Sequence, residues 1–366
     1  MLLVALCVAA CGSRPKTPKQ PSPADVSRAG HPSTSSPTVG TVARTRSRWV
    51  PVDWGELPGF DSDDTSAAWN AWLQSCERPP SALARLCPQV RKLALASDSE
   101  RRAWMRANLQ PHRVQTTGGE RQGLLTGYYE PLFDAARQRQ PGFEAPLYAP
   151  PAGLRQGARW YTRQQIDQGA LLAGRELVWL RDPVDVMIVQ IQGSGRVRVR
   201  EAGGGVRTVR MAFAGTNGHS FRSPARWLMQ QGATRDASWP GVRAALAARP
   251  HLVQPFMWSN PRVVFFKEEA LGSVDEHFGP RGAQGVPLTA GRSIAVDPRS
   301  IPYGTPVWLV SSGPAGNLQR LVLAQDTGSA ITGAVRADFF TGTGEAAGAL
   351  AGSMKQPLYL WALWPK

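Results

Sequence analysis

The sequence predicts an α+β protein that is helical near its start and mostly β beyond residue 120. Between residue 62 and about residue 110, apolar residues follow helical spacing behind capping residues. Beyond residue 120, short apolar runs alternate with Gly and Pro turns, which is typical of strands in barrels and sandwiches. No internal repeat and no strand–helix–strand alternation occurs in the sequence. A parallel, doubly wound sheet is therefore not expected.

Residues 1–13, MLLVALCVAACGS, form an apolar run that is too short to span a bilayer and resembles the core of a secretory signal. The run contains VAAC, the pattern of a bacterial lipobox, so residues 1–11 are predicted to be a lipoprotein signal with Cys11 as the lipidated residue. A cleaved signal without lipid is the alternative. No basic residue precedes the run, which favours a translation start upstream of Met1. Gly12 is typical of lipoproteins sent to the outer membrane, so we expect an outer-membrane lipoprotein facing the periplasm of a Gram-negative bacterium.

Residues 12–47 are rich in Pro, Ser, Thr and Gly and contain few large apolar side chains. Such a segment buries too little apolar surface to offset the entropy lost on ordering. It is predicted to be a flexible linker between a lipid anchor and the folded part of the chain.

Two cysteines remain beyond the predicted signal, Cys76 and Cys87. Export to the periplasm would place them in an oxidising compartment, where one disulfide between them is expected. Two buried thiols are the alternative.

The helical part begins at Ser62 or Asp63, either of which could cap a helix that carries Trp69 and Trp72. The segment SDSERRAWMRANL opens with capping residues and predicts a further helix, and Pro79-Pro80 separates helical runs. The runs predicted as strands are LLTGYY (124–129), VDVMIVQIQGSG (184–195), GRVRVREAGG (195–204), RVVFFKE (262–268), TPVWLVSS (305–312), RLVLAQD (320–326) and LYLWALW (358–364).

The formal net charge of +15 suggests an anionic partner, although charge that is merely dispersed over an arginine-rich chain is an equal alternative. The basic residues are scattered without a run of five, so nucleic acid is not expected as a partner. The histidines are isolated from one another and from the cysteines, so neither a metal site nor another cofactor is predicted. Ser194 in QGSGR lacks the outer glycines of a nucleophile elbow and is predicted to lie in a tight turn after a strand.

Three aspartates in the C-terminal third, Asp297, Asp326 and Asp338, follow apolar or small residues, so each is expected near a strand end. Asp326 begins DTGS, as in aspartic proteases, but that chemistry needs two carboxylates and the chain carries one such motif. Asp297 and Asp326 also fit turn-capping roles. Asp338 lies in ADFF, which offers no turn. Its apolar neighbours would raise its pKa and keep it protonated, as a general acid requires.

The segments that contain these aspartates, from VPLTAGRSIAVDPRSIPYGTPVWL through LVLAQDTGSAITGAVRADFF to LYLWAL, resemble a three-aspartate barrel domain. More closely, these segments look like the membrane-bound lytic murein transglycosylase A family. The upstream segments LLTGYYEPLF, VQIQGSGRV, FAGTNGHSF and NPRVVFFKE resemble that family too, so the likeness spans roughly residues 120 to 366.

The resemblance implies a double-psi β-barrel domain built from residues 48–131 and 261–366. A second, smaller β-barrel domain, residues 132–260, would be inserted between these segments, with the glycan in the groove between the domains. Asp338 would match the family's catalytic acid, and Asp326 and Asp297 the two aspartates that accompany it. Glu130 in YYEP departs from the pattern expected in some relatives, and its role is left open.

The implied reaction is cleavage of the β-1,4 bond between N-acetylmuramic acid and N-acetylglucosamine in peptidoglycan, with one aspartate as acid and base and a 1,6-anhydromuramic acid product. Peptidoglycan glycan strands would be the substrate, and complexes with other cell-wall enzymes are a further class of partner. A hydrolase of another β-glycan on the same barrel and a non-catalytic peptidoglycan-binding lipoprotein are the alternatives.

The same motifs supply candidate substrate-binding residues. Tyrosines would stack on sugars or fill the core, polar side chains would donate and accept hydrogen bonds in the groove, and glycines would allow close backbone approach. These candidates are Thr126, Gly127, Tyr128, Tyr129, Gln190, Gln192, Gly193, Ser194, Gly195, Gly215, Asn217 and Tyr303.

Overall fold

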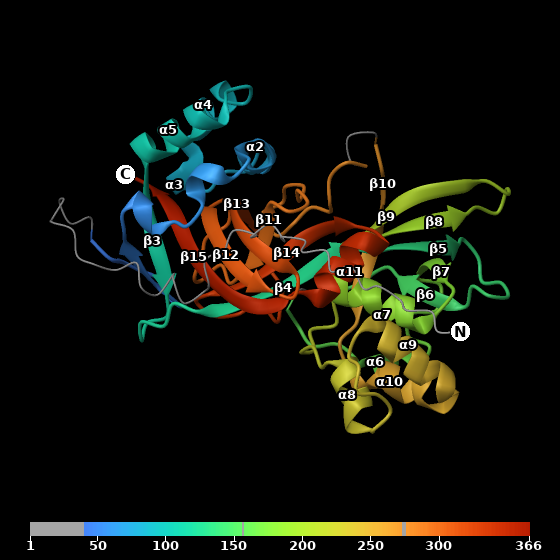
Figure 1. Ribbon diagram of the computed structural model, residues 1–366. Helices are drawn as coiled ribbons and strands as arrows, with labels where there is room; N and C mark the ends of the chain where they lie inside the picture. The colour runs from blue at the N-terminus through green and yellow to red at the C-terminus, as the bar shows by residue number, and fades with distance from the viewer. Residues whose placement is uncertain (1–39, 156, 273–275) are drawn as a thin grey trace, which may run out of the picture. The chain divides into compact units, whose positions relative to one another are not determined.

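Two β-sheets organise the described part of the chain, which comprises residues 40–155, 157–272 and 276–366 of the computed structural model (Figure 1). Helices cover both sheets, so the predicted mixture of an early helical part and two barrel-like sheets is confirmed. The predicted signal with Cys11, and the predicted linker as far as residue 39, lie outside the described residues.

The early helical part consists of short helices that pack beside the larger sheet. They are η1 (Trp54–Glu56), η2 (Phe60–Ser62), α2 (Thr65–Ser75), α3 (Ser81–Ala84), α4 (Cys87–Lys92) and α5 (Asp98–Asn108). Asp64, rather than Ser62 or Asp63, caps α2 by accepting a hydrogen bond from the Ser66 amide (2.8 Å). Asp63 is instead buried in an ion pair with Arg292 (2.7 Å), which ties the helices to the sheet. The capping signal before α5 is confirmed as a capping box.

A disulfide joins Cys76, directly after α2, to Cys87 at the start of α4. It closes a short loop that contains α3 and holds the helical part together on the surface of the larger sheet.

The larger sheet has nine strands, and part of it closes on itself. In pairing order the strands are β1 (Val42–Ala43), β2 (Arg48–Pro51), β3 (Leu109–Gln115), β15 (Lys355–Pro365), β12 (Pro306–Gly313), β13 (Gly316–Asp326), β11 (Ser293–Val296), β14 (Arg336–Thr343) and β4 (Gly123–Glu130). Because β4 pairs with both β14 and β15, the strands β15, β12, β13, β11, β14 and β4 form a closed ring. Its interior is apolar and includes the buried side chains of Leu125, Ile294 and Phe339.

The folded part begins before the predicted end of the linker at residue 47. β1 pairs with β2 through Val42 and Ala43, and the Ser47 side chain is buried and donates to the Ser300 carbonyl (3.3 Å). Low apolar content therefore did not prevent Val42 and Ala43 from adding a short strand to the sheet edge.

The second sheet has six strands and lies against most of the remaining helices. In pairing order its strands are β10 (Val264–Ala270), β9 (Val206–Thr216), β8 (Gly195–Arg200), β5 (Leu132–Ala136), β7 (Glu176–Leu180) and β6 (Ala145–Tyr148), and β6 and β10 also contact each other. The helices that follow β6 are α6 (Arg163–Gln168), α7 (Pro183–Gln192), α8 (Pro224–Gln230), α9 (Trp239–Ala248), η3 (Pro250–Leu252), α10 (Val253–Ser259) and α11 (Glu345–Ser353). β10 pairs with β9, so this sheet continues past the predicted limit at residue 260.

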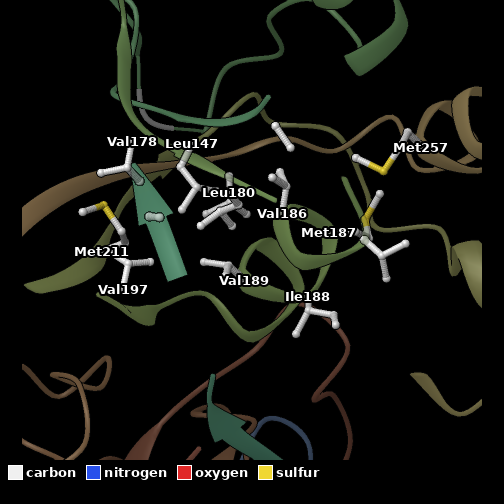
Figure 2. Close-up of a cluster of buried hydrophobic side chains, with 14 of the residues drawn as sticks. Leu147, Val178, Leu180, Val186, Met187, Ile188, Val189, Val197, Met211 and Met257 are labelled. Carbon is white, nitrogen blue, oxygen red and sulfur yellow. The ribbon is translucent and has the colours of Figure 1, made fainter. Parts of the chain in front are cut away.

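Most of the segment 184–195, predicted as a strand, lies in the helix α7 (Pro183–Gln192). Asp182 caps it by accepting from the Val184 amide (2.8 Å), Pro183 occupies its first turn, and Gly193 ends it with a positive φ of 84°. Figure 2 shows Val186, Met187, Ile188 and Val189 of α7 among buried side chains of the second sheet. A helix that is apolar on most sides has no clear helical period, so the pattern favoured a strand. The prediction was wrong for this reason.

None of the helices in the described ranges is long and apolar enough to cross a membrane.

Candidate active site

Strand register brings two of the three candidate aspartates together. On β11, Ala295 pairs with Asp326 of β13 on one side and with Asp338 of β14 on the other. On the far side of β14, Asp338 lies opposite Thr126 of β4. Because Ala295 has only a methyl side chain, the two carboxylates can share the space above it.

Ala295, Asp326 and Asp338 line a cavity of about 310 Å³. Part of its wall comes from the nine-stranded sheet and the loop after β13, and part from α7, β9, β10 and the loops beside them. The lining residues are Gly127, Tyr128, Ala295, Asp326, Thr327, Gly328, Ser329, Ala330, Ile331, Arg336 and Asp338 on the first side, and Gln190, Ile191, Gln192, Gly193, Phe213, Phe221, Asn260, Arg262 and Val264 on the other. The cavity therefore combines carboxylates, amides, guanidinium groups and aromatic rings, which is a set suited to a polar, carbohydrate-like ligand.

Of the two carboxyl groups in this cavity, Asp338 accepts fewer hydrogen bonds. Its Oδ1 accepts a hydrogen bond from the Thr126 hydroxyl (2.5 Å), and Oδ2 has no protein hydrogen-bond donor within the described ranges. Burial raises the pKa of Asp338, while the Thr126 hydrogen bond and the charge of Arg336 act in the opposite direction. Such a carboxyl group can hold a proton at a pH where an exposed aspartate is ionised.

Asp326 is held by more donors than Asp338. Its Oδ2 accepts from the Tyr128 hydroxyl (3.0 Å) and its Oδ1 accepts from the Ala283 amide (2.9 Å). Burial raises the pKa of Asp326 to about 6, against the effect of these donors, and the charge of Asp338 adds to the increase. The DTGS segment therefore places a well-anchored second carboxylate in the cavity.

Asp297 does not line the cavity, although the resemblance groups it with the other two aspartates. It is 2% exposed and forms a two-point ion pair with Arg299 (2.9 and 3.0 Å), and it also accepts from the Gly333 amide (3.0 Å). Burial, the largest single effect, would raise the pKa of Asp297. The hydrogen bonds and the charge of Arg299 together outweigh it, so the pKa of Asp297 is lowered. The turn-capping interpretation therefore describes its contacts: Asp297 ties the end of β11 to the loop before β14.

The structure brings five of the predicted substrate-binding residues to the cavity wall. They are Gly127, Tyr128, Gln190, Gln192 and Gly193. Gly127 is required on structural grounds as well, because a Cβ atom there would lie 2.7 Å from the Ala351 Cα of α11. Thr126 is not a wall residue but hydrogen-bonds to Asp338.

The other predicted substrate-binding residues lie outside the cavity lining: Tyr129, Ser194, Gly195, Gly215, Asn217 and Tyr303. Alternation along β4 turns Tyr129 away from Tyr128 and packs it against the core of the second sheet. The Asn217 side chain is fully buried and bonds to the Tyr161 and Pro261 carbonyls and the Val263 amide, so it holds loops together. Burial raises the pKa of the Tyr303 hydroxyl. The Tyr303 side chain also lies close enough to Thr327 and Asp326 for both to shift this pKa.

Most of the lining residues were not predicted from the sequence, and among them are the large side chains of Phe213, Phe221, Arg262 and Arg336. Phe213 is 51% exposed on β9, opposite the bulge between Phe265 and Phe266 that interrupts the pairing with β10. The sequence could have predicted Arg336, because it lies two positions before Asp338 on one strand and its side chain therefore points to the same face of the sheet. The bulge that turns Phe213 outward left no local signal.

Glu130, whose role the sequence left open, is at the other end of β4 and does not line the cavity. It is fully buried and accepts hydrogen bonds from Arg196 (2.8 Å) and Arg210 (2.6 Å) of the second sheet. Thr343 of β14 adds a third donor (3.2 Å). Glu130 therefore belongs to a buried ion cluster that connects the two sheets.

No three His, Cys, Asp or Glu side chains gather as a metal site anywhere in the described part of the chain.

Comparison with known families matches two segments of the chain. Residues 124–267 match the family described as the MltA specific insert domain, and residues 292–364 match the 3D domain. The first segment includes the second sheet and β4, and the second contains all three aspartates.

Individual relatives resemble the chain over most of its length. The membrane-bound lytic murein transglycosylase A of Escherichia coli strain K12 is 32% identical over 261 residues, which is 68% of this chain and 68% of the relative. Among solved structures, the lytic transglycosylase LtgG of Burkholderia pseudomallei is 40% identical, with a TM-score of 0.61 over 90% of this chain and 98% of that one. MltA from Neisseria gonorrhoeae is 26% identical, with a TM-score of 0.76 over 90% of this chain and 96% of that one.

Proposed function

Because the chain belongs to the membrane-bound lytic murein transglycosylase A family, we propose that it cleaves the glycan strands of peptidoglycan and releases 1,6-anhydromuramic acid ends. The bond broken is the β-1,4 bond between N-acetylmuramic acid and N-acetylglucosamine. The observation that carries this proposal is the environment of Asp338, a carboxyl group in the cavity with a raised pKa and one oxygen to which no donor of the described residues is hydrogen-bonded.

In the proposed reaction, protonated Asp338 gives its proton to the glycosidic oxygen as the bond to the muramic acid C1 breaks. The resulting carboxylate then takes the proton of the C6 hydroxyl of the same sugar, and that oxygen bonds to C1. No water is consumed, and Asp338 ends protonated for the next cycle. Because the nucleophile is tethered to the reacting carbon, its effective molarity can reach about 10⁵ M or more, and a second catalytic carboxylate is not required.

The contacts of Asp326 support a mechanism with one acid. A hydrolase needs a second carboxylate that is free to act as a nucleophile or to activate water. Both oxygens of Asp326 already accept hydrogen bonds, from Tyr128 and from the Ala283 amide, which favours a positioning and electrostatic role. Burial raises the pKa of Tyr128, whose ring packs on Phe340, and the charge of Asp326 raises it further.

The cavity suits an anionic sugar polymer. Arg336 and Arg262 place guanidinium groups on opposite walls of the cavity, and the wall with Arg262 also carries the exposed ring of Phe213. Muramic acid carries a lactyl carboxylate or a peptide stem, and the chain as a whole has a formal net charge of +15. Phe213 offers an apolar face against which a pyranose ring can pack.

The proposed location is the outer membrane, facing the periplasm, with lipid attached at Cys11. The membrane-bound relatives and the apolar run that ends in VAAC support it. We further assign the catalytic barrel to the strands of the nine-stranded sheet, and the inserted domain to the segment from β5 to β10 rather than to residues 132–260.

The test is digestion of purified sacculi with the full chain, followed by mass spectrometry of the soluble products. We expect muropeptides that are lighter by one water than those with reducing ends. Products with reducing-end muramic acid alone would show hydrolysis instead, and binding without soluble product would show a non-catalytic protein. Asp338→Asn should bind sacculi and release nothing, whereas Asp61→Asn, at an exposed aspartate on η2, should match the wild type.

A further inference from the structure

Three side chains from two neighbouring strands form a chain of hydrogen bonds that ends on Asp338. Arg336 Nη2 donates to Thr126 Oγ1 (2.8 Å), and Thr126 Oγ1 donates to Asp338 Oδ1 (2.5 Å). Arg336 is fixed at its other end, because its Nη1 donates to the carbonyls of Leu124 (3.3 Å) and Ala337.

The strand register places the side chains of Arg336, Thr126 and Asp338 next to one another. Arg336 and Asp338 are two residues apart on β14, so their side chains share one face of the sheet. In the parallel pairing of β14 with β4, Asp338 lies opposite Thr126 and Arg336 lies opposite Leu124. The Thr126 hydroxyl therefore stands beside both the guanidinium group and the carboxyl group.

The donor and acceptor properties of these groups decide which way the hydroxyl points. A guanidinium group has only donors, so the Thr126 oxygen must act as an acceptor towards Arg336. The single hydroxyl hydrogen of Thr126 is then directed at Asp338 Oδ1. An oxygen that accepts this hydrogen is a poor position for the acid proton, so the proton is left to Oδ2.

We propose that Arg336 is a positioning residue that acts through the Thr126 hydroxyl, so that Asp338 carries its acid proton on Oδ2, the oxygen that the protein leaves for the substrate. This inference rests on the proposed function of Asp338 as the acid. After the proton has been given away, the same two donors stabilise the negative charge on Oδ1, and the carboxylate is kept ready to accept the C6 proton through Oδ2. Thr126 therefore acts on the acid rather than on the sugar.

Other charged and titratable groups near Asp338 do not duplicate this effect. Asp326 on β13 and Tyr128 on β4 line the same cavity, and Arg262 belongs to the opposite wall. Asp326 and Tyr128 are hydrogen-bonded to each other, and Arg262 donates to the His219 carbonyl (3.2 Å). Within the described residues, Thr126 is the one side chain that hydrogen-bonds to the Asp338 carboxyl group.

The first experiment compares Thr126→Val, which has the same shape without the hydroxyl, with Thr126→Ser, which keeps the hydroxyl. Turnover of a soluble, peptide-free peptidoglycan strand by the full chain is measured from pH 4 to 9. Losing a hydrogen bond to a charged group should lower kcat about 10- to 100-fold for Thr126→Val, with little change in KM. Since this donor lowers the pKa of Asp338, the basic limb of the profile should move up by about one pH unit. Thr126→Ser should restore both.

The second experiment compares Arg336→Met with Arg336→Lys in the same assay. Arg336→Met should move the basic limb in the same direction as Thr126→Val but by less, and should lower kcat. Arg336→Lys, which keeps a donor and a charge near Thr126, should recover part of the loss. Combined with Thr126→Val, Arg336→Met should add little further shift, because the hydroxyl through which Arg336 acts is already gone.

Several results would overturn the inference. A Thr126→Val profile that superimposes on the wild type would show that the hydroxyl does not act on the acid. A rise in KM for Arg336→Met with an unmoved limb would make Arg336 a substrate-binding residue. If a variant is poorly folded by circular dichroism, the pH limb is still read on its folded fraction, because a limb position does not depend on the amount of active protein. Failure of the proposed function is separate: Asp338→Asn would then keep wild-type turnover.

Discussion

The two ends of the β4–β14 strand pair carry two carboxyl groups with opposite surroundings, Glu130 fully buried and Asp338 partly buried. At one end, Asp338 lies opposite Thr126 and accepts a single hydrogen bond from a neutral hydroxyl. At the other end, Glu130 pairs with Thr343 and accepts from two guanidinium groups as well as from the Thr343 hydroxyl. Glu130 is fully buried and Asp338 is partly buried at the cavity, and the number and charge of their donors also differ. These differences distinguish a carboxylate that holds the fold from one that is able to react.

The two guanidinium groups at the Glu130 end are themselves held in place. Arg196 donates to the Glu276 and Phe278 carbonyls (2.9 and 2.8 Å), and Arg210 donates to the Phe278 carbonyl (2.9 Å). At the Asp338 end, the nearest guanidinium group reaches the carboxyl group only through Thr126. At one end of the strand pair, guanidinium groups fully compensate the charge of Glu130. At the other end, the charge of Asp338 is compensated only in part.

The largest effect is expected at the partly compensated end. Asp338→Asn removes the proposed acid but keeps the size of the side chain, so turnover should fall by about 10³-fold or more. Its thermal midpoint should stay equal to the wild-type value or rise, because a poorly compensated buried carboxyl group is lost. Rates on sacculi and a thermal melt measure the two quantities. A variant with full activity would move the catalytic role to Asp326.

Breaking the compensated end should affect stability instead. Glu130→Ala leaves Arg196 and Arg210 buried without their carboxylate, and should lower the free energy of unfolding by about 3–5 kcal/mol. Glu130→Gln, the size-matched control, should lose less, because it keeps one acceptor oxygen. Denaturant unfolding gives the difference. If turnover per folded molecule fell together with stability, the two ends would not be functionally distinct.

Asp326 lies between these extremes and should show a dependence on pH. Its pKa is raised to about 6 in the folded protein, so the native state holds this proton more tightly than the unfolded chain does. Its contribution to stability is therefore lost as the pH rises through 6. Asp326→Asn removes this loss and should stabilise the protein above pH 6 by about 1–2 kcal/mol, less than the full linkage because hydrogen bonds from Tyr128 and Ala283 change.

The measurement is the difference in unfolding free energy between Asp326→Asn and the wild type from pH 4 to pH 8. The difference should grow in favour of the variant between pH 4 and pH 7. A variant that is less stable than the wild type at pH 8 would show that the hydrogen bonds to Asp326 outweigh the cost of burying its charge.

The smallest effect is expected for Phe213, an apolar residue on the wall across from both carboxylates. Phe213→Ala should raise KM about 10-fold by removing roughly 1.4 kcal/mol of apolar contact with the glycan, and should leave kcat nearly unchanged. Val206→Ala truncates another exposed apolar side chain of β9, outside the cavity, and is the matched control. A fall in kcat with an unchanged KM would assign Phe213 to the reacting end of the site instead.

Local patterns were sufficient where the local signal and the tertiary structure agree. The capping residues before α5 and the apolar runs of β4, β12, β13 and β15 lie where the sequence predicts helices and strands. α7 was predicted as a strand, because a buried helix shows no polar face. The limit of the second sheet was placed too early, since the pairing of β10 with β9 is a long-range contact that no local pattern records.

The candidate site shows the same division. Asp338 stood out because large apolar neighbours imply burial, and the cavity contains it. Asp297 was grouped with it, although its ion pair with Arg299 depends on a turn that the letters DPR already suggested. Thr126 was assigned to the sugar, because its hydrogen bond to Asp338 depends on the β4–β14 register, which joins residues 212 positions apart.

The closure of the strand ring has a consequence for biogenesis. β4 ends at residue 130, but the strands that pair with it, β14 and β15, are the last two strands of the chain. Until those strands have been synthesised, β4 lacks its partners on both edges and Thr126 has no Asp338 carboxyl group beside it. The long intervening segment makes this closure a high-contact-order step, which is slow compared with the formation of local hairpins. The pairing of Thr126 with Asp338 is therefore absent from a partly made chain and forms only once β14 has been synthesised.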